Sequence, residues 1–283
     1  MRSSTAEAKS ASNPTGNLLR QWRDVRGKSQ LDLSLDAGVS QKHISFVESG
    51  RSMPSRQMLL DLAQALDVPL RERNALLLAA GYAPIYSDGA LDGPAMKSIN
   101  KALQRMLRQH EPFPAIVMDR YWNVLLTNDA APRFFNCFID MAARQGNRNL
   151  LHLMFDPAGM RPFIANWPNL GRALLARVYR ESLGHVIDAK TRSLLAELSQ
   201  YPDVKPEWHA PTPGDTMPMI PLAFTKDGVT LNYFSMITTV GTPQAIAAEE
   251  LRIESMFPAD EATEVEHTPF ILANSAHQPS TPH

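Results

Sequence analysis

The sequence predicts an α+β protein, with an N-terminal domain of five short helices followed by a domain in which helices flank an antiparallel sheet. Between residues 16 and 81 apolar residues recur at helical spacing, and Ser, Pro and Gly stand where such helices begin and end. Two later pairs of β-rich runs are each joined across a short turn. A Pro-, Gly- and Asp-rich passage at residues 81–94 separates the two patterns and indicates two domains.

The composition excludes several classes of protein. The 283 residues include 44% hydrophobic ones and carry a net charge of −1, which suits two folded domains. A single cysteine, Cys137, excludes an internal disulfide or a multi-cysteine zinc cluster, and its apolar neighbours favour a place in the core. No apolar run is long enough to span a membrane, and residues 1–13 lack the apolar core of a signal peptide, so we expect a cytoplasmic protein without a membrane partner. The sequence shows no phosphate-binding glycine loop, catalytic carboxylate pair or Ser/His/Asp arrangement, so we expect neither an enzyme nor a cofactor or metal.

The stretch from residue 29 to residue 51 is the most informative part of the chain, because it predicts two short helices joined by a tight turn. Ser29 can cap the first of them, and Asp32 three residues later completes a capping box. Gly38 falls where the chain must turn, a place that often needs positive φ. Ser40 can cap the second helix. The apolar positions of that helix, expected to point inward, are Ile44 and Val47.

The remaining helices of this domain follow the same logic. The first carries an apolar stripe of Leu18, Leu19, Trp22 and Val25, and the second contains Leu31, Leu33 and Leu35. The fourth begins after Ser55, and its apolar residues are Leu59, Leu62, Ala63 and Leu66. The fifth, Leu70–Ala80, follows Pro69 and ends at Gly81. Because every helix is short, the five must pack against one another to persist.

The second helix of the central pair leaves polar side chains on its outer face. These are Gln41, Lys42, His43 and Ser45, with Phe46 beside them. A helix that exposes amide and ammonium groups is suited to the major groove of DNA. The mild excess of Lys and Arg in residues 16–80 agrees with such a partner, whereas the residues after 240 are acidic. The alternative is a helical hairpin whose polar face only meets solvent.

Two hairpins predict the sheet of the second domain. The runs of the first are Ala115–Met118 and Trp122–Thr127, and those of the second are Met217–Phe224 and Val229–Thr239. Lys-Asp-Gly at residues 226–228 provides the turn of the second. Helical segments are expected near Asn149–Phe155, Gly171–Ser182 and Ala189–Leu198, with an amphipathic helix at Lys97–Gln109. An antiparallel sheet crossed by helices can enclose a cavity for a small molecule.

We therefore expect five parts along the chain. They are a disordered N-terminus at 1–15, the five-helix domain at 16–81, a linker and connecting helix at 82–109, the sheet domain at 110–258, and a flexible acidic, Pro-rich tail at 259–283.

Several of these motifs resemble known families. Residues 16–80 resemble the lambda-repressor-like helix-turn-helix of the XRE family of bacterial regulators. The segments LLAAGYAP at 77–84, PAIVMDRYWNVLLTN at 114–128 and RNLLHLMF at 148–155 resemble the MmyB-like transcription regulators, in which a PAS-like ligand-binding domain follows the DNA-binding domain. The resemblance spans about residues 16–258. It implies binding to double-stranded DNA and a small apolar ligand such as a fatty acid. Since a single recognition helix reads only a few base pairs, we expect a homodimer on a pseudo-palindromic operator. The alternative is a second domain that serves only dimerisation or partner binding.

The resemblance also implies roles for individual residues of the first domain. Its DNA-contacting positions are Gln30, Ser40, Gln41, Lys42, Ser45, Phe46 and Arg51, with Gln30 and Arg51 on phosphates. Gln41 can form two hydrogen bonds with adenine, and Lys42 can donate to guanine or hold a phosphate instead. Phe46 can touch a thymine methyl or pack on the protein. Arg23 and Glu48 match a pair that forms a structural salt bridge between the first and third helices.

The ligand contacts expected in the second domain are Trp122, Asn128, Arg148, Phe155, Trp167 and Arg180. Asn128 can equally cap the helix that follows it, and the aromatic residues can be plain core. Arg148 or Arg180 would receive the acidic head of a fatty acid, or else form surface or interdomain salt bridges. The chain departs from the family at Met217-Pro218, where His-Pro is common. Because Pro221 cannot donate a ladder hydrogen bond, its strand is expected at an edge or with a bulge.

Overall fold

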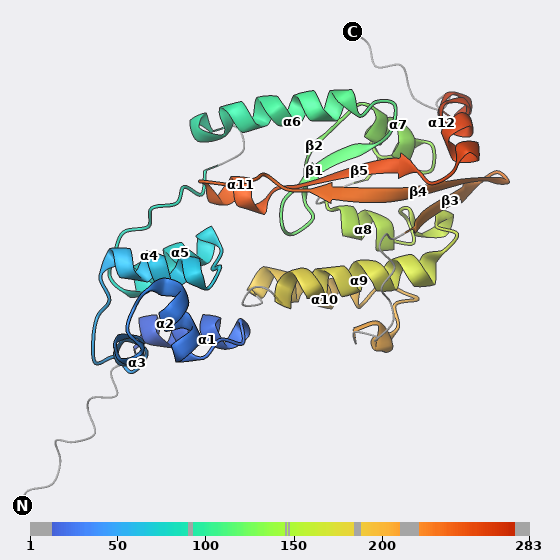
Figure 1. Cartoon of the computed structure of the whole chain (residues 1–283). Helices are drawn as coiled ribbons and strands as arrows, with labels where there is room; N and C mark the ends of the chain where they lie inside the picture. Colours follow the sequence, from blue (N-terminus) through green and yellow to red (C-terminus); the bar gives the residue numbers. More distant parts are fainter. Residues whose placement is uncertain are drawn as a thin grey trace, which may run out of the picture. The chain divides into compact units, whose positions relative to one another are not determined.

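The computed structural model describes residues 13–89, 93–144, 146, 148–183, 188–209 and 221–274. The chain divides into two compact units (Figure 1). The first is formed mainly by residues up to Asp88, with residues 244–246, and the second by most of the remainder. This α+β organisation is the one that the sequence predicts.

The first unit contains five helices. They are α1 Pro14–Val25, α2 Gln30–Ala37, α3 Gln41–Glu48, α4 Arg56–Ala65 and α5 Leu70–Ala79. Each of the expected serine caps, Ser29, Ser40 and Ser55, accepts a hydrogen bond from a backbone amide in the first turn of its helix. Asp32 completes the capping box, and Gly38 has a φ of 65° at the end of α2. Local chemistry therefore sets the ends of these helices as the sequence indicates.

Three apolar residues of the first two predicted helices do not join the core of this unit. Val25 is 41% exposed, and Leu31 and Leu35 are 52% and 75% exposed. On α2 only Leu33 is buried, because residues two apart lie on opposite sides of a helix. The buried core consists of Leu19, Trp22, Leu33, Ile44, Val47, Leu59, Leu62, Ala63, Leu66, Val68, Leu76, Leu77 and Ala80.

The second unit is built on a five-stranded antiparallel sheet in the order β2-β1-β5-β4-β3. Its strands are β1 Ala115–Met118, β2 Val124–Thr127, β3 Pro221–Lys226, β4 Val229–Thr238 and β5 Arg252–Pro258. Both predicted hairpins form, and the turn of the second has positive φ at Asp227 and Gly228. β3 is an edge strand, as Pro221 indicates, while the segment that begins at Met217 lies outside the described residues. The central strand β5 was not predicted, although it joins the two hairpins into one sheet.

Helices cover both faces of this sheet (Figure 1). The helices that follow the first unit are α6 Lys97–Gln109, α7 Ala130–Asn136, α8 Leu150–Phe155, α9 Trp167–Leu183, α10 Ala189–Leu198, α11 Ile246–Glu250 and α12 Glu261–Asn274, with 3-10 helices at Pro94–Met96, Arg161–Phe163 and Pro206–His209. α6 lies along one face and packs against β1, so this helix is part of the second unit rather than a free connection. α8 and α9 lie on the opposite face. Among the described residues, no helix combines the length and apolar character that crossing a membrane requires.

The flexible tail expected after residue 258 is wrong for residues 261–274, which form α12. His267 of this helix is buried, and its Nε2 donates to the carbonyl oxygen of Pro112 at 2.9 Å. Its Nδ1 accepts from the hydroxyl of Tyr233 on β4 at 2.6 Å. Thr263 Oγ1 accepts from the amide of Asn232 at 2.9 Å. These hydrogen bonds to distant residues hold the helix against the sheet.

Candidate functional site

The predicted recognition helix α3 presents its polar residues as the sequence indicates. Ser40 Oγ accepts from the amide of His43 at 3.3 Å and so fixes the start of the helix. Ile44 and Val47 are buried against the other helices of the unit. Gln41 and Lys42 are exposed beside each other at the first turn. The amide of Gln41 and the ammonium group of Lys42 can therefore form hydrogen bonds with a partner outside the protein.

Phe46 organises the cations on this face. The Lys42 ammonium lies 5.6 Å from the centroid of the Phe46 ring, and the Arg51 guanidinium lies 5.9 Å from it. An aromatic face attracts cations at this range. Phe46 is half-buried, so it packs on the protein while gathering two positive charges on one surface.

Glu48, at the end of α3, is the centre of a buried hydrogen-bond network. Glu48 is only 3% exposed. Its carboxylate accepts hydrogen bonds from Arg23 Nε at 2.7 Å, from Arg20 Nε at 3.3 Å and from Gln30 Nε2 at 2.9 Å. The expected Arg23–Glu48 ion pair is thus present. Burial alone would raise the pKa of Glu48, but the hydrogen bonds from Arg23 and Gln30 outweigh burial and hold that pKa below its ordinary value. Gln30, expected on a phosphate, uses one amide hydrogen inside the protein.

Asn13 is a structural contact that the sequence analysis missed. It was placed in a disordered N-terminus, yet its Oδ1 caps α1 by accepting from the amide of Gly16 at 3.0 Å. Its Nδ2 donates to the carbonyl of Val47 at 2.9 Å and to that of Glu48 at 3.2 Å. Asn13 therefore joins the start of α1 to the end of the recognition helix. The residue type favours a cap, but its partners lie more than thirty residues away along the chain.

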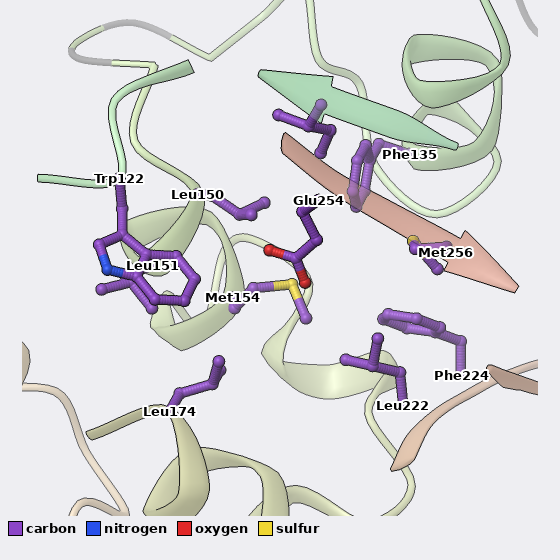
Figure 2. A pocket seen from close by; sticks show the side chains of 11 residues that line it. Trp122, Phe135, Leu150, Leu151, Met154, Leu174, Leu222, Phe224, Glu254 and Met256 are labelled. Atoms are coloured by element: carbon purple, nitrogen blue, oxygen red, sulfur yellow. The ribbon is translucent and has the colours of Figure 1, made fainter. Parts of the chain in front are cut away.

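A small, partly open cavity of about 30 Å³ lies within the second unit, beneath the sheet (Figure 2). It is lined by Ile116, Trp122, Phe135, Leu150, Leu151, Met154, Leu174, Leu222, Phe224, Glu254 and Met256. These residues come from β1, β3, β5, α7, α8 and α9 and from the turn that contains Trp122. Its lining is almost entirely apolar, as in many small-molecule sites. Of the expected ligand contacts, Trp122 lines this cavity.

Glu254 is the exception in the lining. It lies on β5, where it pairs with Ile116 on one side and Ile237 on the other. Its carboxyl group points into the cavity (Figure 2), and its Oε2 is buried without a hydrogen-bond partner among the described residues. Burial raises the pKa of Glu254, opposed by the charge of Arg177 and a hydrogen bond with Ser235. Glu254 is absent from the predicted site residues because its strand, β5, was not predicted.

Asn128 has a structural role rather than a place in the cavity. Its Oδ1 accepts from the amides of Ala115 at 3.0 Å and Ala131 at 3.1 Å. Its Nδ2 donates to the carbonyl of Phe113 at 2.7 Å. The side chain thus caps α7 and fixes the start of β1, which is the alternative to ligand contact that the sequence leaves open.

The other expected ligand contacts also lie elsewhere. Phe155 and Trp167 pack edge to face in the core, with ring centroids 4.8 Å apart, and neither lines the cavity. Arg148 and Arg180 are exposed and do not line it either. Arg177, one turn before Arg180 on α9, is the arginine that faces inward toward the cavity wall.

Arg177 is held in place by two contacts. Its Nε donates to Oε1 of Glu181 at 2.8 Å, and its guanidinium lies 4.6 Å from the centroid of the Trp122 ring. The cation therefore rests on a residue of the cavity wall while its charge is paired with Glu181.

Among the described residues, no three His, Cys, Asp or Glu side chains are grouped as metal ligands. Burial raises the pKa of the Cys137 thiol to about 11, which disfavours the reactive thiolate.

Comparisons with known proteins follow the division into two units. A family model described as "MmyB-like transcription regulator ligand binding domain" matches residues 99–267, and one described as "Helix-turn-helix" matches residues 19–73. A comparison with curated proteins gives no match. A solved structure described as "Structure of an RNA-binding Light-Oxygen-Voltage Receptor" is 12% identical and covers 98% of this chain and 70% of that chain, but its TM-score of 0.28 is too low to carry an argument. Because the first family model spans more than half of the sequence, the chain belongs to the MmyB-like transcription regulators, with a helix-turn-helix domain followed by a ligand-binding domain.

Proposed function

We propose that this regulator reads an operator through α3 and changes its DNA binding when a small, mainly apolar molecule occupies the cavity of its second unit. The observation that carries the proposal is an apolar cavity beneath the sheet of the second unit, in a chain whose first unit exposes a polar recognition helix. We infer a binding role rather than a catalytic one, and a place of action in the cytoplasm, where bacterial DNA lies.

The proposed DNA contacts divide by chemistry. Gln41 forms two hydrogen bonds with adenine, and Lys42 donates to guanine O6 or N7, each contact discriminating by about 1–3 kcal/mol. Arg51 contacts a phosphate and so contributes affinity without sequence preference. Ser40 and Ser45 flank these positions on α3. Since one recognition helix reads few base pairs, we propose that a homodimer binds a pseudo-palindromic operator.

The proposed ligand carries an alkyl chain of the fatty-acid kind. The lining of the cavity supports an alkyl chain in the ligand, because leucine, methionine, isoleucine and aromatic side chains surround the cavity. It does not support an acidic head received by Arg148 or Arg180, since both lie outside the lining. The alternative function, a second unit used only for dimerisation or partner binding, gives no role to an apolar cavity that holds a carboxyl group.

Native mass spectrometry of the purified full chain, with small molecules identified in the denatured extract, tests the ligand site. A stoichiometric lipid-sized adduct supports the sensor. Ligand can regulate DNA binding only if it binds one arrangement of the dimer more tightly than another. The operator affinity of ligand-free and ligand-saturated protein must therefore differ, and identical affinities would leave the dimerisation module as the better account.

A further inference from the structure

Glu254 is the one charged side chain among the described residues that line the cavity. It is only 9% exposed, and its carboxyl group points into the apolar space (Figure 2). Oε2 has no hydrogen-bond partner among the described residues. A buried carboxylate with one oxygen left without a partner is unfavourable, so the group either stays protonated or meets a partner that enters the cavity.

The groups that face Glu254 come from a few elements. α9 contributes Arg177 and Glu181, and β4 contributes Ser235, which hydrogen bonds with the carboxyl group. The other lining residues on β1, β3, β5, α7 and α8 are Ile116, Leu222, Phe224, Met256, Phe135, Leu150, Leu151 and Met154, none of which is charged. The cavity is thus a low-dielectric space with one carboxyl group and one internally paired arginine at its edge.

Charge balance decides which head group fits. Arg177 and Glu181 form an ion pair, so together they contribute almost no net charge. A ligand carboxylate would add a negative charge beside Glu254. Drawing Arg177 onto that ligand would leave Glu181 without its partner. An ammonium group would instead form a charge-assisted hydrogen bond with Glu254 and leave the cavity neutral.

We propose that the cavity binds an apolar molecule with an amine head, and that Glu254 is the residue that binds this head. The inference rests on the proposed function, since it names the head group of the ligand of that same cavity. It replaces the acidic head of a fatty acid with a basic one while keeping the alkyl chain.

The proton balance of binding follows from the pair that forms. When an ammonium ion enters and Glu254 is protonated, the carboxyl proton leaves to solvent, and an ammonium–carboxylate pair remains. When the neutral amine enters, the same proton moves from Glu254 to the amine nitrogen and the same pair forms. At neutral pH alkylamines are ammonium ions, so binding to the protonated form of Glu254 releases a proton to the buffer.

Isothermal titration calorimetry of the full chain with octylamine, octan-1-ol and octanoate tests the inference, because the three compounds share a chain and differ only in the head. Titrations in two buffers of different ionisation enthalpy measure the proton released. We expect octylamine to bind at least about ten-fold tighter than octanoate, with proton release that the alcohol does not show. Octanoate binding as tightly as octylamine would overturn the inference and leave the sensor intact. Failure of all three compounds to bind would overturn the sensor as well.

Glu254→Gln keeps the size of the side chain and removes its charge. We expect this variant to retain octan-1-ol binding, which shows an intact cavity, and to lose both the preference for octylamine and the proton release. Glu266→Gln is the matched control, since Glu266 is exposed on α12. It should bind all three compounds as the unchanged protein does. An amine preference that survives in Glu254→Gln would contradict the inference.

Discussion

Nε of Arg23 lies 2.7 Å from Oε1 of Glu48, and this ion pair joins α1 to the last residue of α3. Because Glu48 is almost fully buried, its carboxylate depends on the groups that surround it. The same carboxylate accepts from Gln30 at the start of α2. One buried charge therefore ties α1 to α2 and α3, the two helices of the DNA-binding motif.

Arg23→Ala should lower the free energy of unfolding of the first unit by about 3 kcal/mol, since it leaves a buried carboxylate without its main partner. Urea denaturation of the full chain, followed by circular dichroism, measures this loss. Asp36→Ala is the control, because Asp36 pairs with Lys28 at a more exposed site, where about 1 kcal/mol or less is expected. Equal losses in the two variants would mean that Glu48 does not depend on Arg23.

Replacing Gln41 and Lys42 together by alanine should abolish the preference of the protein for its operator over random duplex. Each base contact contributes about 1–3 kcal/mol of discrimination, whereas nonspecific binding depends on phosphate contacts. Fluorescence anisotropy with both duplexes measures the two affinities. If both fall by the same factor, the two residues only hold phosphate.

Arg51→Ala should behave in the opposite way. Loss of one phosphate contact weakens binding to the operator and to random duplex alike. It also lowers the salt dependence of binding by about one counterion. Anisotropy titrations over a range of salt concentrations measure this slope. A selective loss on the operator would instead assign Arg51 to base reading.

His267 should make the second unit sensitive to acid. Burial lowers the pKa of His267 below its ordinary value, against the opposing effect of the hydrogen bond with Pro112. The neutral form is therefore favoured in the folded state, and its stabilisation is present above about pH 6.5 and lost as the pH falls. Thermal unfolding between about pH 8 and about pH 5 should show a steeper loss of stability in the unchanged protein than in His267→Gln. His43→Gln, in the other unit, is the control. Identical pH profiles for the unchanged protein and His267→Gln would contradict this assignment.

Glu254 should have the opposite pH dependence in the ligand-free protein. Its folded-state pKa is raised by burial, so its contribution to stability is greatest below its ordinary pKa and is lost as the pH rises. Glu254→Gln does not titrate and should therefore gain stability relative to the unchanged protein between about pH 5 and about pH 8. Chemical denaturation at a series of pH values measures the difference. A difference that does not change with pH would show that Glu254 is not desolvated.

The sequence predicts the elements whose ends depend on local chemistry. The caps at Ser29, Ser40 and Ser55 and the turn at Gly38 involve residues within four positions of each other, so their signals are contained in the sequence. The exposed first turn of α3 follows from the same local pattern.

The sequence fails where distant residues decide the structure. β5 carries Glu254 and Ser255 among its apolar residues and becomes a strand only by pairing with β1 and β4. α12 is acidic and contains Pro269, and it is held by His267 through Tyr233 and Pro112, far away in the chain. The polar residue of the cavity could not be predicted for the same reason, because Glu254 lies on β5.

The central claim is that occupancy of the cavity changes DNA binding. An operator selected by the full chain from random duplexes allows its affinity to be measured by anisotropy, with the cavity empty and with it saturated by the tightest-binding compound of the octyl series. We predict that the two affinities differ by about five-fold or more, which corresponds to a coupling free energy of about 1 kcal/mol or more. Equal affinities with a filled and an empty cavity would contradict the account.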